Sequence, residues 1–257
     1  MTASPAIDAF VFLGQSLFGY GQSVEELLAR MDASGVESAI VCPVKPRGYR
    51  LESANDLIGD AVSRQPRFVG LARVDPNLGA EAADELDRAL VTLGVGGLFL
   101  HPWEENFRAN ARLVDPLLER CAEHHVPVLL ATGYPWLSEA AQVGDLARRF
   151  PGVPIVMTHG GQINISGLGQ FDALDVLRRC HNVMIETSGV YRQDFVEDVA
   201  RDIGPERVLF GSSSPRMDTR LEIERVRWAN LPDEARALML AGNARRLFRL
   251  GSSVLRS

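Results

Sequence analysis

The feature that most constrains this chain is a regular alternation of short apolar runs with longer amphipathic stretches, sustained from one end to the other. The apolar runs are continuous, which is typical of strands that are buried on both faces of a parallel sheet. Eight such runs occur, at residues 7–13, 37–43, 67–74, 95–102, 126–133, 153–160, 182–189 and 207–213. No linker, repeat or low-complexity segment interrupts them, so we expect one domain over residues 1–257.

The segments between the apolar runs have helical periodicity. The predicted helices span residues 23–35, 53–66, 79–94, 112–125, 137–151, 171–180, 195–204 and 232–250. Parallel strands joined by helices require right-handed crossovers, and at this length they close most economically into a (β/α)₈ TIM barrel, an α/β fold. An open doubly wound sheet is the alternative, but no glycine-rich dinucleotide motif follows the first strand.

The charge balance narrows the class of partner. The net charge is −6 and the pI is about 5.5, which argues against nucleic acid or a membrane surface as a partner. Three unpaired cysteines suit a reducing compartment, and the N-terminal residues lack the pattern of a signal peptide. We therefore expect a cytoplasmic protein that binds a small molecule, with a homodimer as the default oligomeric state.

In a TIM barrel, the carboxyl ends of the strands and the loops that follow them form the active site. The loop after the first strand, residues 14–22, is rich in glycine and aromatic residues and is predicted to be a mobile cover. The candidate site residues are Arg47 after the second strand, Arg73 at the end of the third, His101 and Trp103 after the fourth, Tyr134 after the fifth, His159 after the sixth, Glu186 on the seventh and Ser213 after the eighth.

A series of motifs occurs in a characteristic order along the chain. They are IDAFVF (7–12), GLFLHP (97–102), PVLLATG (127–133), THGG (158–161), RVLFGSSSP (207–215) and NARRLF (243–248). This order resembles the metal-dependent amidohydrolase superfamily, specifically the amidohydrolase 2 branch of small-acid decarboxylases and lactone hydrolases. The resemblance covers nearly the whole chain and implies the same barrel fold.

The departures from that family fall on its metal ligands. The resemblance implies a divalent metal, usually zinc, held by two opening histidines, a histidine after strand five and an aspartate after strand eight. The matching positions are Phe10, Phe12, Ala131 and Ser213, and none of them supplies such a ligand. Phe99 occupies the position that matches the family's lysine on strand four. We therefore expect no metal and no other cofactor, with Phe10 and Phe12 on one strand face filling the space.

Three residues are predicted to be catalytic. His159 matches a histidine that the resemblance implicates in proton transfer; the alternative is a relic bonded to neighbouring backbone. Glu186 is either a carboxylic acid with a raised pKa or the ion-pair partner of an arginine. Ser213 could pair with His159 as a nucleophile, but without a G-x-S-x-G elbow a simple turn residue is favoured.

The remaining candidates are predicted to bind the substrate. Arg73, Arg47 and Arg216 could each clamp a carboxylate or phosphate, with an ordinary structural role as the alternative. The other predicted binding residues, which would line an apolar and aromatic pocket, are His101, Trp103, Tyr134, Phe10 and Phe12.

The combined prediction is a metal-independent hydrolase, lactonase or decarboxylase-type lyase that acts on a small apolar or aromatic organic acid. His159 would serve as its acid/base. One alternative is a catalytically inactive homologue that binds a metabolite or a partner subunit. Such a protein would bind its ligand without turnover, which distinguishes it from an enzyme. Another is a metal site rebuilt from Asp8, His101, His159 and Glu186, which elemental analysis of the purified protein would reveal.

Overall fold

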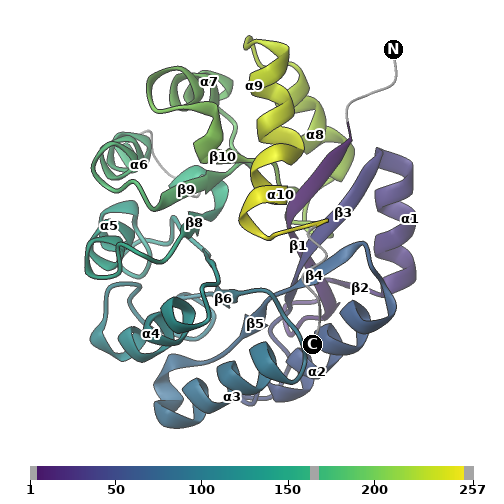
Figure 1. The fold of residues 1–257 in the computed structure, drawn as a ribbon, viewed down its shortest axis with the longest axis vertical. Coiled ribbons are helices and arrows are strands. Elements are labelled where there is room, and N and C mark those ends of the chain that lie inside the picture. Colours follow the sequence, from purple (N-terminus) through teal and green to yellow (C-terminus); the bar gives the residue numbers. More distant parts are fainter. Residues whose placement is uncertain (1–4, 163–167, 252–257) are drawn as a thin grey trace.

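A computed structural model describes residues 5–162 and 168–251 of the chain. Eight parallel strands close into a barrel with helices around it (Figure 1), so the predicted (β/α)₈ fold is confirmed. In order around the barrel, the strands are β1 (Ala6–Gln15), β3 (Val36–Pro43), β4 and β5 (Phe68–Gly70 and Ala72–Arg73, which together form the third), β6 (Leu98–Leu100), β7 (Val128–Leu130), β8 (Ile155–Met157), β9 (Val183–Glu186) and β10 (Val208–Leu209).

Two irregular joints complete the barrel. The third strand, predicted as one run, is divided at Leu71, whose backbone N–H still donates to Val41 O at 2.9 Å. The last strand reaches the first through the Ala9 N–H, which donates to Phe210 O at 2.9 Å, and through a bridge between Val11 and Ser214. Backbone groups at both joints are therefore paired, as buried amides require.

The helices surround the strands in the expected order. They are α1 (Val24–Ser34), α2 (Glu52–Arg64), α3 (Ala80–Val91), α4 (Asp115–Glu123), α5 (Ala140–Arg149), α6 (Leu168–Arg179), α7 (Gln193–Asp202), α8 (Thr219–Arg227), α9 (Asp233–Ala237) and α10 (Asn243–Leu247). The helix predicted over residues 23–35 is confirmed as α1, with Ser23 and Glu26 forming a capping box before it and a left-handed Gly35 after it. We did not predict α8, whose many charged residues obscure the apolar period. The predicted helix 232–250 is divided by a π-helical turn at Leu238–Gly242.

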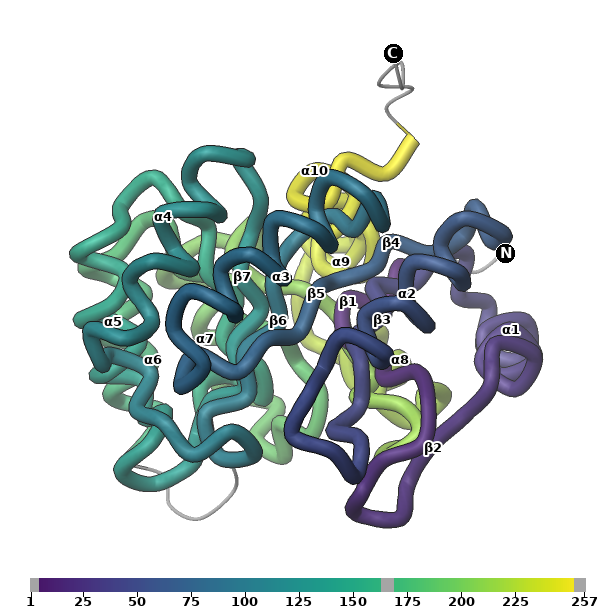
Figure 2. The backbone as a smooth tube through the Cα atoms, turned by 90° about the horizontal axis from the view of Figure 1, so that it is seen from below, coloured from purple at the N-terminus to yellow at the C-terminus, as the bar shows by residue number. Residues whose placement is uncertain are grey.

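The barrel has two distinct ends. At one end β2 (Gly21–Gln22) pairs antiparallel with the last residues of β1, which places it at the carboxyl ends of the strands. At the other end Ala244 and Phe248, in and just after α10, pack into the apolar cluster inside the barrel. Figure 2 shows β2 and α10 on opposite sides of the molecule. The predicted cover loop is therefore on the side where the candidate site residues lie.

Close packing between the barrel and α2 makes Gly70 sensitive to substitution. A Cβ at Gly70 would lie 2.4 Å from Ile58 Cγ2 and 3.0 Å from Val62 Cγ2. We expect Gly70→Ala to lower the free energy of unfolding by about 1–3 kcal/mol, because a packed core resists an added methyl group. Urea unfolding measures this, with Gly152→Ala as control because no atom lies within 4 Å of its Cβ position. Equal midpoints for the two variants would contradict the prediction.

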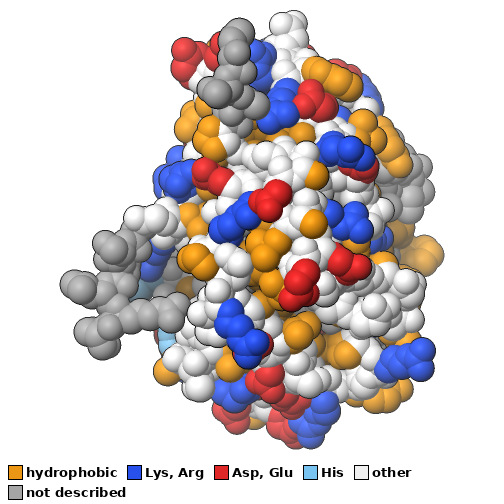
Figure 3. Space-filling model, turned by 90° about the vertical axis from the view of Figure 1, so that its right-hand side faces the viewer, with side chains coloured by type: hydrophobic (Ala, Val, Ile, Leu, Met, Phe, Trp, Pro, Cys, Tyr) orange, Lys and Arg blue, Asp and Glu red, His pale blue; other side chains and the backbone are white. Residues whose placement is uncertain are grey.

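The outer surface carries intermingled charge. Figure 3 shows basic and acidic side chains interspersed with apolar ones on one face of the molecule. Many of the exposed charges are paired, as Arg64 is with Asp60 and Arg179 with Asp175. Within the described residues, no helix has both the length and the apolar character needed to cross a membrane.

Candidate active site at the carboxyl ends of the strands

Three phenylalanines occupy the centre of the barrel below the site. Phe10 and Phe12 lie on the same side of β1, and their ring centroids are 4.9 Å apart in an edge-on arrangement. Phe99 from β6 lies 5.7 Å from each of them, and all three rings are buried. Such edge-to-face contacts stabilise an aromatic cluster beyond simple burial. We call Phe10, Phe12 and Phe99 the aromatic floor.

The residues present do not fit the divalent metal of the resembling family. The resemblance places two histidine ligands at Phe10 and Phe12, whose rings cannot bind a metal. Phe10 and Phe99 contact the rings of His159 and His101 at 5.8 and 5.9 Å. Among the residues that the structure describes, no three His, Cys, Asp or Glu side chains gather closely enough to hold a metal ion. The alternative set of Asp8, His101, His159 and Glu186 is therefore not assembled into a ligand sphere.

His159 follows β8 and is held in one defined orientation. Its backbone has a φ of 57°, in the left-handed region, and its side chain is 5% exposed. Nδ1 lies 3.0 Å from Ser188 O, and because a carbonyl can only accept, Nδ1 carries the proton. Burial lowers the pKa of His159 to about 4, so the ring is neutral at pH 7. Nε2 therefore offers a lone pair.

Glu186 reaches His159 through a serine that the sequence analysis missed. Ser188 Oγ lies 3.0 Å from His159 Nδ1 and donates to Glu186 Oε2 at 2.9 Å. The Glu186 carboxyl also accepts from the backbone N–H groups of Ser188 and His159 at 2.5 and 3.2 Å. Burial raises the pKa of Glu186 to about 8. Ser188 lies two residues after Glu186, on the same face of an extended strand, and this spacing could have identified it from the sequence.

Ser213 does not form the nucleophile pair with His159 that was the less favoured of its two possible roles. It has a φ of 54°, and its buried Oγ has no hydrogen-bond partner within the described part of the chain. The adjacent Ser212 instead holds Asp8, donating to its carboxylate from N at 2.8 Å and from Oγ at 2.5 Å. Burial raises the pKa of Asp8 to about 7. These contacts tie β1 to the segment after β10.

His101 is fixed in the tautomer opposite to that of His159. The backbone N–H of Glu104 donates to its Nδ1 at 3.3 Å, so the ring proton is on Nε2. Nε2 faces Tyr134 Oη at 3.4 Å and Glu104 Oε1 at 3.5 Å. Burial holds the pKa of His101 well below its usual value. The site thus contains one neutral imidazole that accepts at Nε2 and one that donates there.

Arg73 is paired with carboxylates and is not an open clamp. Its side chain is fully buried and donates to Glu104 and, at 2.7 Å, to Glu105. Lys45 Nζ lies 2.9 Å from the same Glu105 oxygen, Oε1. We call Lys45, Arg73, Glu104 and Glu105 the ion cluster. Sequence reasoning missed its lysine and both glutamates, although EE directly follows the HPW motif.

Arg216 is the arginine that remains available at the rim. Its guanidinium lies 5.6 Å from the centre of the Tyr20 ring, and its side chain is exposed. Its positive charge opposes the rise that burial causes in the pKa of Tyr134. Within the described residues no carboxylate forms an ion pair with it. Arg47, by contrast, is on the exposed loop after β3, and no described contact connects it to the site.

Aromatic side chains close the rim above the floor. Trp103 stacks on Tyr134 with 5.8 Å between ring centroids, and Phe18 lies 5.6 Å from Trp103. Phe18 and Trp103 are each about half exposed. The segment predicted as a cover, residues 14–22, therefore packs against this rim through Phe18. Its mobility stays a prediction.

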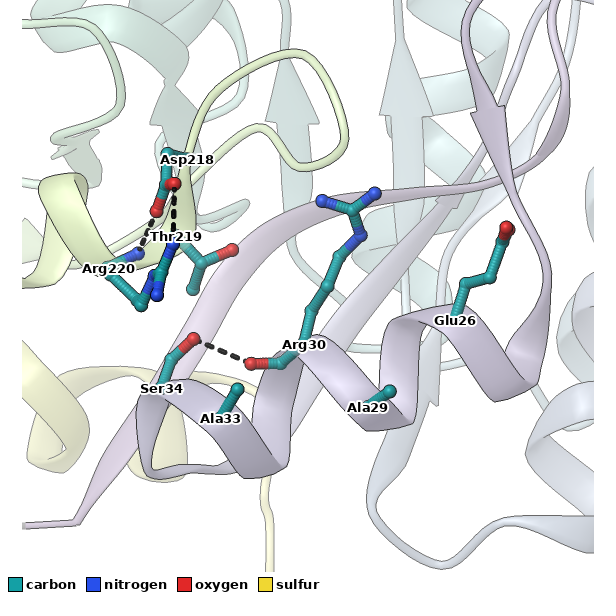
Figure 4. Close-up of a pocket in the computed structure, with 8 residues that line it drawn as sticks. All are labelled: Glu26, Ala29, Arg30, Ala33, Ser34, Asp218, Thr219 and Arg220. Carbon is teal, nitrogen blue, oxygen red and sulfur yellow. Dashed lines mark hydrogen bonds and ion pairs between the residues drawn. The ribbon is translucent and has the colours of Figure 1, made fainter.

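A separate hollow of about 420 Å³ lies outside the barrel. Figure 4 shows side chains of α1 facing the start of α8 across it. Its lining residues are Glu26, Ala29, Arg30, Ala33, Ser34, Asp218, Thr219 and Arg220. None of them is a candidate site residue, and Asp218 and Arg220 bind each other. The hollow is therefore not part of the site.

Comparison with known proteins gives one sequence family and many similar folds. A family described as "Amidohydrolase" matches residues 13–250. No curated protein sequence matches the chain. Among solved structures, 5-carboxyvanillate decarboxylase from Sphingomonas paucimobilis superposes with a TM-score of 0.78 at 19% identity, over 96% of this chain and 100% of that one.

Two further structures extend this comparison. An uncharacterised TIM-barrel protein from Bordetella bronchiseptica has a TM-score of 0.76 at 19% identity, over 96% of this chain and 99% of its own. A dihydroxybenzoic acid decarboxylase from Polaromonas sp. JS666, solved with manganese and 2-nitroresorcinol, has a TM-score of 0.73 at 20% identity, over 97% of this chain and 98% of its own. At these identities the likeness establishes the fold.

Proposed function

This chain belongs to the amidohydrolase family, and from that premise we propose that it is an enzyme acting without a metal on a small apolar or aromatic organic acid. The reaction is a decarboxylase-type cleavage or a hydrolysis, such as lactone opening, in which His159 transfers the proton. A substrate of this class enters among the aromatic rings of the rim. The named decarboxylases of the same fold act on carboxylated aromatic rings, which supports testing such acids first.

The observation that carries this proposal is the fixed tautomer of His159. A neutral imidazole whose Nδ1 is held by Ser188 can accept a proton at Nε2 without first losing one to solvent. Glu186 acts through Ser188 and keeps the ring oriented, which makes it a positioning residue. Together the three groups form a preorganised base beside the ring of Phe10.

The proposal also assigns donors to the negative charge that develops on the substrate. His101 donates its Nε2–H to a substrate that takes the place of Tyr134 Oη, and Arg216 supplies a full positive charge at the rim. Donors that are already oriented stabilise a developing anion without the cost of reorganising water. The proposal assigns to these donors the electrostatic role that a metal has in the resembling family.

We expect His159→Gln to lower kcat by about 10²–10⁴-fold, the usual effect of removing a general acid or base. The measurement is turnover of a panel of hydroxybenzoates, 3-oxo acids and lactones, with His181→Gln, an exposed histidine, as control. Dialysis against a chelator should leave the wild-type rate unchanged. A stoichiometric metal whose removal abolishes turnover would contradict the metal-independent proposal.

The second candidate is a catalytically inactive homologue that binds a metabolite or a partner subunit. The filled aromatic floor and the neutralised Arg73 favour it, because both remove functional groups from the centre of the barrel. It predicts that acids from the same panel raise the melting temperature but show no turnover.

A further inference from the structure

Lys45 is the only lysine among the 27 basic residues of this chain, and all the others are arginines. An arginine holds a carboxylate at least as well as a lysine does, because its planar fork binds two oxygens. A lysine amine has one capacity that a guanidinium lacks: once deprotonated, it adds to a carbonyl carbon. The choice of lysine at this one position therefore calls for a chemical explanation.

The position of Lys45 suits a reacting group. It lies two residues beyond the carboxyl end of β3, on the face where TIM barrels carry their chemistry. The residue is 7% exposed, and its Nζ lies 2.9 Å from Glu105 Oε1. Through Glu105, Arg73 and Glu104, the ion cluster continues from Lys45 to His101.

The ion cluster is incompletely satisfied. Glu105 Oε1 receives both Lys45 Nζ and Arg73 Nη2, whereas Glu105 Oε2 is buried without a hydrogen-bond partner in the described part of the chain. Arg73 Nε is likewise buried and unpaired among the described residues. A spare acceptor and a spare donor in one buried cluster need an explanation, and a polar ligand would provide it.

Decarboxylation of a 3-oxo acid without a metal is aided by an electron-poor centre that the donors assigned above do not supply covalently. Loss of CO₂ leaves an electron pair on carbon, and the pair must move to an electron-poor centre. A protonated imine made from a lysine and a ketone is such a centre, and it needs no metal. Hydrogen-bond donors alone, such as His101 and Arg216, stabilise charge but do not form this covalent sink.

Resting on the proposed function, we propose that Lys45 forms an imine with the ketone of a 3-oxo acid and so catalyses its decarboxylation. The neutral amine adds to the carbonyl carbon, and the carbinolamine loses water to give the protonated imine. The bond to the carboxylate then breaks, CO₂ leaves, and its electron pair enters the imine to form an enamine. The enamine takes a proton on carbon, and water releases the ketone and Lys45.

Glu105 handles the protons of these steps. It lies within hydrogen-bond reach of Lys45, so it can take the proton that the ammonium must lose before it adds to the carbonyl. Burial raises the pKa of the Glu105 carboxyl, which eases that transfer, although Arg73 and Lys45 oppose the rise. The protonated carboxyl can then return the proton to the departing hydroxyl of the carbinolamine.

The test is reductive trapping with borohydride in the presence of acetoacetate or benzoylacetate. We expect a covalent adduct on the peptide that contains Lys45 and none on the N-terminal amine, which serves as an internal reference. The matched variant is Lys45→Arg, which keeps the positive charge beside Glu105 but cannot form an imine. We expect it to lose 3-oxo acid decarboxylation completely, and circular dichroism checks that it folds.

The outcomes separate this inference from the proposed function. Absence of an adduct on folded wild-type protein, or undiminished decarboxylation by Lys45→Arg, overturns the inference. If other acids are still turned over in a His159-dependent way, the proposed function stands alone. An adduct at Lys45 without turnover of any acid supports imine formation alone, and it overturns both the proposed function and decarboxylation through Lys45.

Discussion

Replacing Glu105 with glutamine is expected to lower the free energy of unfolding by about 3–5 kcal/mol, the usual cost of breaking a buried ion pair. Glu105 is the carboxylate that binds both Lys45 and Arg73, and its side chain is inaccessible to water. Without its charge, Arg73 keeps only Glu104 and Lys45 loses its ion-pair partner, while both cations stay buried. Chemical unfolding at pH 6.5 measures the effect.

The matched control is Glu81→Gln. Glu81 pairs with Arg50, but both side chains are about 60% exposed, at 60% and 63%. An exposed pair contributes about 0–1 kcal/mol, so this variant should unfold close to the wild type. If Glu105→Gln and Glu81→Gln have the same unfolding midpoint, the prediction fails. The ion cluster would then contribute no more to stability than an exposed ion pair does.

The fold was accessible from the sequence because its determinants are local. Continuous apolar runs, helical periods and the caps around α1 each depend on residues near one another, and they predict strand and helix order together. The helix α8 was missed because its short segment contains more charge than apolar pattern. The division of the third strand at Leu71 depends on barrel curvature, which the sequence does not display.

The site was accessible only in part. Position at the strand ends grouped His159 with Glu186, but the sequence assigned no role to Ser188, the residue that connects them. Arg73 was predicted as a substrate clamp because its partners, Glu104 and Glu105, come from a different strand end. Packing determines which residues distant in sequence become hydrogen-bond partners, so these partners could not be predicted from the sequence.

The stability of this protein should fall as pH rises through the range in which Glu186 ionises. Burial raises the pKa of Glu186 from an ordinary 4.5 to about 8. Between these values the folded state keeps a proton that the unfolded state releases, so folding is favoured at lower pH. Each pH unit in this window lowers the free energy of unfolding by about 1.4 kcal/mol. Asp8 adds the same slope up to about pH 7.

The histidines act in the opposite direction over part of this range. Burial lowers the pKa of His159 to about 4, so the unfolded state binds the extra proton below the ordinary value of 6.5. His101 is shifted in the same sense. Their contribution to stability increases with pH up to about 6.5 and then becomes constant. The decline caused by Asp8 and Glu186 should therefore dominate the wild-type profile above pH 6.5.

Glu186→Gln isolates the contribution of one carboxyl. Glutamine does not ionise, so this variant lacks the slope from Glu186 and keeps those from Asp8 and the histidines. The free energy of unfolding of the variant minus that of the wild type should therefore increase by roughly 3–4 kcal/mol from pH 5 to pH 8. Lost hydrogen bonds to Ser188 shift the whole difference by a constant but leave its dependence on pH intact. Urea unfolding across this range, with the exposed Glu119→Gln as control, measures the difference, and parallel profiles would mean that Glu186 is already ionised and solvated in the folded protein.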